Sequence, residues 1–136
     1  GHGELVLVVE DEPIVRNIVV EVLHQLGYQA LEAADAEAAL AILRDTTAVN
    51  MMISDIGLPG MDGRRLADAA RVLHPQLRVL LISGYAPAAV PAAGFLGLDM
   101  TLITKPFTVD ALAARIRQTM ASTRQPEVAA GAKRAR

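Results

Sequence analysis

The feature that most constrains this chain is a repeated alternation of short apolar runs with segments of helical periodicity. The apolar runs are rich in Val, Ile, Leu and Met, and they have the length and composition of strands. They cover Leu5–Val9, Tyr28–Glu32, Val49–Ser54, Arg78–Ile82 and Thr101–Thr104. Strands that alternate with helices form parallel sheets, because each connection crosses over a face of the sheet. The pattern therefore predicts a five-stranded parallel sheet covered by helices on both faces.

The helices expected between these strands have recognisable beginnings and ends. Pro13 suits the first turn of a helix, and Gly27 suits its end. Asp35 and Thr108 are suited to cap two further helices. Pro and Gly interrupt residues 86–97, so the fourth helix is expected to be short or irregular. We therefore predict an α/β, doubly wound, flavodoxin-like sandwich with about five helices.

Length and charge indicate one folded unit with two short extensions. Residues 4–120 fit a single domain, and Gly1-His2-Gly3 resembles a cloning remnant. Residues 121–136 contain four basic residues and one acid, and we expect a disordered basic tail or a linker. The residues up to 120 contain 9 basic and 14 acidic residues. This acidic balance argues against nucleic-acid binding through the folded domain.

The cysteine count and the hydropathy restrict the compartment and the class of chemistry. Cysteine is absent, which excludes disulfides, thiolate catalysis and cysteine metal sites, and fits a reducing cytoplasm. No apolar run approaches the roughly 20 residues that a membrane helix needs, and no signal peptide is visible. We therefore expect a cytoplasmic protein without a membrane partner.

Chemically active side chains follow four of the five predicted strands. The run Glu10–Glu12 follows the first strand, Asp55 the third, Ser83 the fourth and Lys105 the fifth. Doubly wound sheets bind ligands at the carboxyl ends of their strands, which meet at one edge. The sequence thus predicts a site that combines acids, a hydroxyl group and an ammonium group.

This combination suits Mg²⁺-dependent phosphoryl transfer. Grouped carboxylates repel one another unless a cation lies between them, and Mg²⁺ prefers oxygen ligands. The Asp55 carboxylate can attack phosphorus to form an aspartyl phosphate. Lys105 can pair with a phosphate oxygen, and the Ser83 hydroxyl can donate a hydrogen bond to another. A nucleophile, a metal and charge neutralisation are most of what phosphoryl transfer requires.

Four motifs, VVEDEP, SDIGLPGMDG, LLISGY and ITKPF, resemble the receiver domains of two-component response regulators and hybrid sensor kinases. The resemblance covers roughly the first 120 residues, with every motif in the expected order. It implies that Asp55 is the phosphorylated residue, that Ser83 bonds the phosphoryl group and that Lys105 pairs with it. It also implies a cis peptide bond between Lys105 and Pro106, as is usual in the family.

The resemblance further implies a metal site and a set of partners. Asp11, Asp55 and the backbone carbonyl of Gly57 would bind Mg²⁺ directly, and Mn²⁺ could replace it. Glu10 would act through a metal-bound water. The phosphoryl donor would be a phosphohistidine on a histidine kinase or a histidine phosphotransfer protein. Such a domain is a regulatory phosphoacceptor rather than an enzyme, with at most slow self-dephosphorylation.

Two departures from the family concern how the phosphorylated state would be transmitted. The family often has an aromatic switch residue three places before the lysine, where this chain has Leu102. Tyr85 is a candidate to cover the site or to contact a partner instead. The interrupted stretch Pro87–Gly97 lies where the family has its fourth helix, which often serves as an output surface.

Other functions remain open from the sequence. The domain could be cut from a hybrid histidine kinase or from a multidomain regulator, and a homodimer is a further option. A haloacid dehalogenase-type phosphohydrolase would also use Asp and Mg²⁺, but it needs an acid at the position of Gly57. A degenerate receiver would only bind partners, although all the acceptor residues are present. Asp55 alone could also be an ordinary turn residue.

Overall fold

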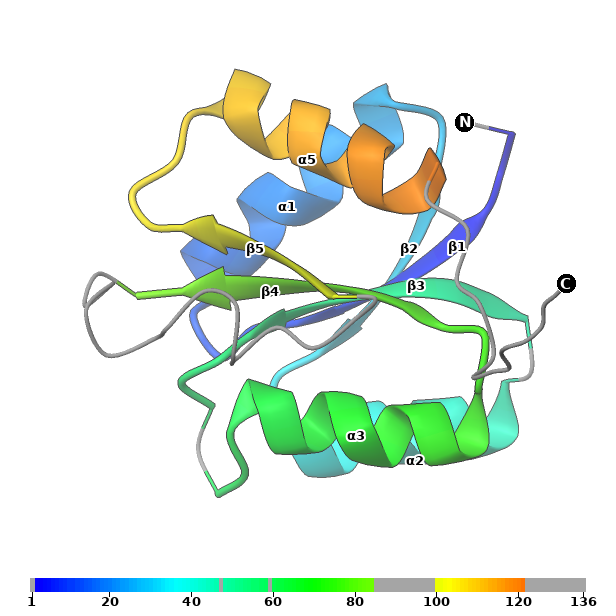
Figure 1. Ribbon diagram of the computed structural model, residues 1–136. Helices are drawn as coiled ribbons and strands as arrows, with labels where there is room; N and C mark the ends of the chain where they lie inside the picture. Colours follow the sequence, from blue (N-terminus) through cyan, green and yellow to red (C-terminus); the bar gives the residue numbers. More distant parts are fainter. Residues whose placement is uncertain (1, 47, 59, 85–99, 122–136) are drawn as a thin grey trace, which may run out of the picture.

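The computed structural model describes residues 2–46, 48–58, 60–84 and 100–121, and these residues form five strands and four helices. Figure 1 labels each element. In chain order they are β1 (Leu5–Val9), α1 (Pro13–Gln25), β2 (Gln29–Ala33), α2 (Ala36–Asp45), β3 (Val49–Asp55), α3 (Gly63–Leu73), β4 (Arg78–Ser83), β5 (Met100–Thr104) and α5 (Val109–Ala121).

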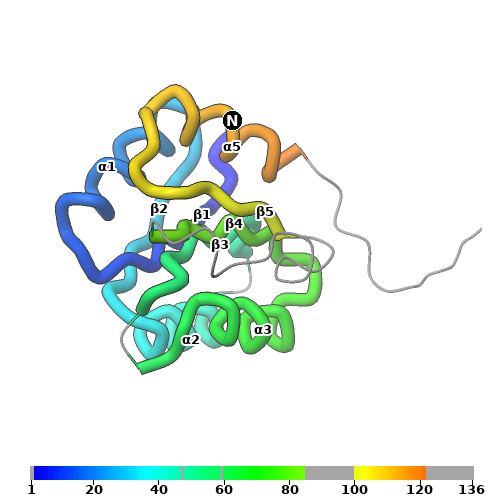
Figure 2. Tube along the Cα trace, turned by 60° about the vertical axis from the view of Figure 1, so that its left-hand side comes forward, coloured from blue at the N-terminus to red at the C-terminus, as the bar shows by residue number. Residues whose placement is uncertain are grey.

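The five strands form one parallel sheet in the order β2-β1-β3-β4-β5. Helices α1 and α5 cover one face, and α2 and α3 cover the other, as Figures 1 and 2 show. This is the doubly wound, flavodoxin-like arrangement, so the predicted fold class is confirmed. The strand order reverses between β1 and β3, and ligands bind such sheets at the carboxyl end of that point.

Aliphatic side chains fill the two spaces between the sheet and its helices. Along β1, Leu7 and Val9 belong to the core on the α2 and α3 side, whereas Val6 and Val8 belong to the core on the α1 and α5 side. All four are at most 1% exposed. The uninterrupted apolar run of β1 is therefore explained by burial on both faces of the sheet.

Polar side chains cap three of the helices. Asp35 accepts a hydrogen bond from the amide of Ala38, and Thr108 accepts one from the amide of Ala111. Both predicted caps are thereby confirmed. Asp62 caps α3 in the same way. These bonds satisfy amides that have no partner within the first helical turn.

Five strand boundaries differ from the prediction by one residue, and two of them are the end of β2, at Ala33, and the start of β5, at Met100. Strand β2 begins at Gln29 because the amide of Tyr28 still donates to the carbonyl of Leu23 in α1, at 2.9 Å. Strands β3 and β4 each run one residue further, to Asp55 and Ser83. Both residues are therefore fixed by the sheet instead of belonging to the loops that follow.

Several expectations concern segments outside the described residues. The irregular fourth helix and Tyr85 lie there, as do residues 122–136 of the expected tail. The first residue of that expected tail, Ala121, is instead the last residue of α5. Among the described residues, no helix has both the length and the apolar character needed to cross a membrane.

Candidate functional site

The predicted site residues meet at the carboxyl edge of the sheet. Strand β3 pairs Asp55 with Ile82 of β4, and β4 pairs Ser83 with Thr104 of β5. The amide of Lys105 then donates to the carbonyl of Ser83, at 2.9 Å. The structure brings together the six residues that sequence reasoning selected, which are Glu10, Asp11, Asp55, Gly57, Ser83 and Lys105. Their chemical roles stay predictions.

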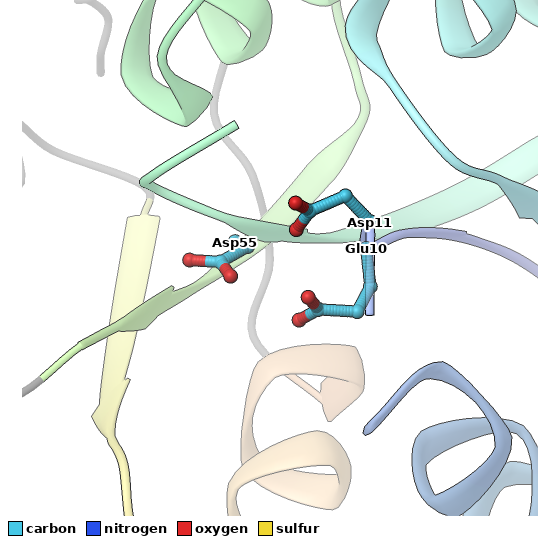
Figure 3. A group of neighbouring side chains, drawn as sticks. All are labelled: Glu10, Asp11 and Asp55. Carbon is cyan, nitrogen blue, oxygen red and sulfur yellow. The ribbon is translucent and has the colours of Figure 1, made fainter. Parts of the chain in front are cut away.

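Three carboxylates form the centre of this site. Figure 3 shows the side chains of Glu10 and Asp11, from the end of β1, beside Asp55 from the end of β3. One oxygen atom of each side chain lies within 4.8 Å of those of the other two. Glu10 and Asp55 are buried, whereas Asp11 is exposed. The cluster is therefore accessible from solvent through Asp11, whereas its other two acids are buried.

Glu10 is a fully buried acid whose two side-chain oxygens have different surroundings. Oε2 accepts a hydrogen bond from the amide of Glu12, at 3.1 Å, whereas Oε1 accepts none from the described residues. Burial raises the pKa of Glu10 to about 7, and the charge of Asp55 adds to the rise. The Glu12 amide and the Lys105 ammonium act in the opposite direction. A buried carboxylate with an oxygen that accepts no hydrogen bond destabilises the folded state unless a cation or a proton compensates its charge.

Lys105 supplies positive charge to this group of acids. Its Nζ atom lies 3.1 Å from Oδ2 of Asp55, 3.6 Å from Oε1 of Glu10 and 3.5 Å from Oε1 of Glu12. Partial burial disfavours the ammonium, but the hydrogen bond and charge of Asp55, with Glu10 and Glu12, keep the pKa of Lys105 above its ordinary value. The peptide bond to Pro106 is cis, as the resemblance implies.

Both carboxylate oxygens of Asp55 have defined partners. Oδ2 faces Lys105, and Oδ1 accepts a hydrogen bond from the amide of Gly57, at 3.1 Å. The next residue, Ile56, donates its amide to the carbonyl of Ile82, at 2.9 Å. The Asp55 carboxylate is thus held in one orientation by contacts from its own loop and from the end of β5.

Sequence reasoning missed Gly63, which it treated only as part of a loop. Gly63 is buried and is the first residue of α3, and its amide donates to the carbonyl of Ile56, at 2.8 Å. A Cβ atom at this position would contact the carbonyl oxygen of Asp55. The sequence did offer one signal for Gly63, which is a glycine directly after the capping Asp62. Glycine is a poor helix former, so a glycine at the start of a helix can indicate that another part of the backbone passes close to it.

The donor set fits the divalent cation that the resemblance implies. Glu10, Glu12 and Asp55 share the ammonium of Lys105, and Asp11 adds a further carboxylate, so negative charge is in excess. The Oε1 atom of Glu10 is buried without a hydrogen-bond donor among the described residues. Oxygen ligands of this kind suit Mg²⁺, which is commonly bound by one or two carboxylates and several waters.

The sequence of this chain is similar to those of known receiver domains, in agreement with the fold and the acidic site described above. The sequence model of the response regulator receiver domain matches residues 6–117. The chain is 36% identical to the sensor kinase CckA of Brucella abortus over 118 residues, covering 83% of the chain and 12% of that kinase. It is 37% identical to the sensor histidine kinase RcsC of Salmonella typhi over 125 residues, covering 86% of the chain and 13% of that kinase. The chain thus spans about an eighth of the length of these relatives.

Solved structures show the same relationship. The receiver domain of the hybrid histidine kinase CckA matches with a TM-score of 0.72 and 35% identity, covering 85% of this chain and 98% of that domain. NtrX from Brucella abortus matches with a TM-score of 0.77 and 32% identity, covering 87% of this chain and 27% of NtrX. With the family model matched over most of its length, the chain belongs to the response regulator receiver domains.

Proposed function

We propose that this receiver domain accepts a phosphoryl group from a phosphohistidine onto Asp55, in a Mg²⁺-dependent reaction, and thereby relays a signal. The observation that carries the proposal is the position of Asp55. Asp55 is 7% exposed at the end of β3, its carboxylate lies 3.1 Å from the Lys105 ammonium, and it is grouped with Glu10 and Asp11. Receiver domains are regulatory phosphoacceptors as a family, and the proposal assigns that chemistry to one residue.

The residues of the site have separate tasks in this reaction. A carboxylate oxygen of Asp55 forms a bond to phosphorus while the bond between phosphorus and the donor's imidazole nitrogen breaks. The leaving imidazole takes up a proton. Lys105 already faces Oδ2 of Asp55 and would pair with the oxygens of the arriving phosphoryl group. Ser83, at the end of the neighbouring strand, would donate a hydrogen bond to the same group.

The metal would be held by residues of two segments, which lie at the carboxyl ends of β1 and β3. Asp11, Asp55 and the backbone carbonyl of Gly57 would be the direct ligands, and Glu10 would act through a water. When bound, Mg²⁺ would neutralise charge on the carboxylates and on the phosphoryl oxygens. Mn²⁺ prefers similar oxygen ligands and would replace it.

We expect Mg²⁺ to stabilise the protein, because it would relieve repulsion among Glu10, Asp11 and Asp55 in the folded state alone. At ten times its Kd, such binding adds about 1.4 kcal/mol to the free energy of unfolding. This corresponds to a rise in Tm on the order of 5 °C for a domain of this size. Thermal melts of EDTA-treated protein with added Mg²⁺ measure the effect. Asp11→Asn should lose most of it, and an equal rise in that variant would contradict the ligand assignment.

An apolar surface beside the site supports a protein as the phosphoryl donor. Ile14 and Ile18, one turn apart on α1, are 74% and 41% exposed, and contiguous exposed apolar side chains mark interaction surfaces. The adjoining pocket has a volume of about 470 Å³ and is lined by Val15, Ile18, Lys105, Pro106 and Phe107. Because the similar proteins CckA and RcsC are sensor kinases, the donor we propose is a histidine kinase or a histidine phosphotransfer protein. We place this exchange in the cytoplasm, since a cysteine-free chain needs no oxidising compartment.

The phosphohydrolase alternative has no support from the comparisons. That chemistry needs a general acid two residues after the nucleophile, where this chain has Gly57. The amide of Gly57 instead donates to Asp55. An origin within a hybrid kinase or a multidomain regulator stays part of the proposal, because the chain covers only part of its relatives' length.

The proposal is tested by the intact mass of the wild-type protein after incubation with acetyl phosphate, with and without Mg²⁺. We expect a Mg²⁺-dependent gain of one phosphoryl group, about 80 Da. The adduct should be lost on treatment with hydroxylamine, which cleaves acyl phosphates. No gain from acetyl phosphate, together with no gain from a phosphorylated histidine phosphotransfer protein, would contradict the proposed function.

A further inference from the structure

The segment between β1 and α1, which carries two of the three clustered acids, is held by few hydrogen bonds. The amide of Glu10 donates to the carbonyl of Ala33 at the end of β2, at 3.0 Å, and the amide of Glu12 donates to the Glu10 side chain. Helix α1 has no side-chain cap, since Glu12 makes no capping hydrogen bond. Lys105 contacts the side chains of Glu10 and Glu12, but it does not bond the backbone that leads into Asp11. A hydrogen bond to the carbonyl of Glu10 therefore adds a constraint on the direction of that backbone.

Arg16 holds that carbonyl from the first turn of α1. Its Nη1 atom donates to the backbone oxygen of Glu10 at 2.8 Å, and its Nε atom donates to Oε1 of Glu32 at 3.2 Å. The Arg16 side chain is 20% exposed, so these charged hydrogen bonds are partly shielded from water. Because the guanidinium is planar, its two bonds fix the Glu10 carbonyl relative to both α1 and β2.

We propose that Arg16 is a positioning residue for the metal site. By fixing the peptide between Glu10 and Asp11, it sets where the side chains on either side of that peptide point (Figure 3). The inference rests on the proposed function, because it assumes that these acids bind a divalent cation. It adds a residue that contacts neither the metal nor the phosphoryl group but acts through the backbone of a ligand segment.

The charge of Arg16 and its hydrogen bond to Glu10 predict opposite changes in Mg²⁺ affinity when Arg16 is removed. The guanidinium is a positive charge next to a cation site, so its loss through Coulomb interactions alone would make Mg²⁺ bind more tightly. Loss of the hydrogen bond to the Glu10 carbonyl would let the acids move and would weaken binding. The direction of the change in affinity therefore separates the two effects.

Calorimetric titration of Mg²⁺ into the metal-free protein tests the inference. We expect Arg16→Ala to raise the Kd on the order of 10-fold, as the loss of outer contacts commonly does at metal sites. Arg16→Lys, which keeps the charge and one donor, should recover part of the affinity. Glu32→Gln is the matched control, because it weakens the outer ion pair but leaves the bond between Arg16 and Glu10. Its Kd should stay within about twofold of the wild type.

A second readout needs no metal. Amide hydrogen exchange in EDTA should become faster in the β1–α1 segment of Arg16→Ala and stay unchanged there in Glu32→Gln. Arg16→Gln provides the same comparisons if Arg16→Ala does not fold. An unchanged or lower Kd in Arg16→Ala, with normal binding by the wild type, would overturn the inference alone. A wild-type protein that binds no Mg²⁺ would instead contradict the proposed function.

Discussion

Replacing Asp55 with asparagine is expected to abolish phosphoryl uptake, leaving less than about 1% of the wild-type mass gain. An amide oxygen is a far weaker nucleophile than a carboxylate, and it cannot form a stable bond to phosphorus. The fold should persist, because the amide oxygen of Asn can still accept the hydrogen bond that Gly57 donates to Oδ1. The variant also removes one of the clustered negative charges beside Glu10. Intact mass after incubation with acetyl phosphate and Mg²⁺ measures the loss, and circular dichroism checks the fold.

The matched control is Asp68→Asn, which makes the same chemical change at an exposed position of α3. It should gain the phosphoryl group as the wild type does. Persistent uptake by Asp55→Asn would mean that another carboxylate is the acceptor, and Asp11 is the exposed acid of the cluster. Peptide mapping of the phosphorylated wild-type protein locates the acceptor independently, and a phosphoryl group on any residue other than Asp55 would refute the assignment.

The fold was predictable because a strand buried on both faces of the sheet carries mostly apolar side chains, and such runs can be recognised in the sequence. In β3, six of the seven residues are buried, and the segment reads as an apolar run that ends in an acid. Parallel strands end at the same edge of the sheet, so Asp55, Ser83 and Lys105 could be expected near one another from strand positions alone. The fold and the location of the site could thus be predicted from the apolar runs of the strands, together with the rule that parallel strands end at one edge of the sheet.

The contacts that orient the site could not be predicted in the same way. The bond between Arg16 and the carbonyl of Glu10 depends on the direction that α1 takes as it leaves β1. The contact between Gly63 and the backbone of Asp55 depends on how closely α3 returns to the end of β3. Each is a tertiary distance of a few ångströms, whereas periodicity reports only which face of a helix is apolar.

That close return of α3 makes Gly63→Ala the substitution with the largest expected effect on stability. The new Cβ would contact the carbonyl oxygen of Asp55 and lie 2.9 Å from Cα of Ile56. These are backbone atoms, so no side-chain rotation can relieve the overlap, and α3 or the end of β3 must move. We expect a loss of about 1–3 kcal/mol in the free energy of unfolding, the usual range for overpacking. The helix preference of alanine, at most about 1 kcal/mol, would offset only part of it.

Urea denaturation measures this loss as a lower midpoint with an unchanged m-value. Gly84→Ala is the control just after β4, because a Cβ there meets no atom of the described residues within 4 Å. That variant should keep the wild-type stability or gain up to about 1 kcal/mol, since alanine restricts the unfolded chain. Because the overlap falls on the backbone of Asp55, Gly63→Ala should also weaken Mg²⁺ binding, whereas Gly84→Ala should not. Equal stability and Mg²⁺ affinity in the two variants would mean that α3 does not constrain the position of Asp55.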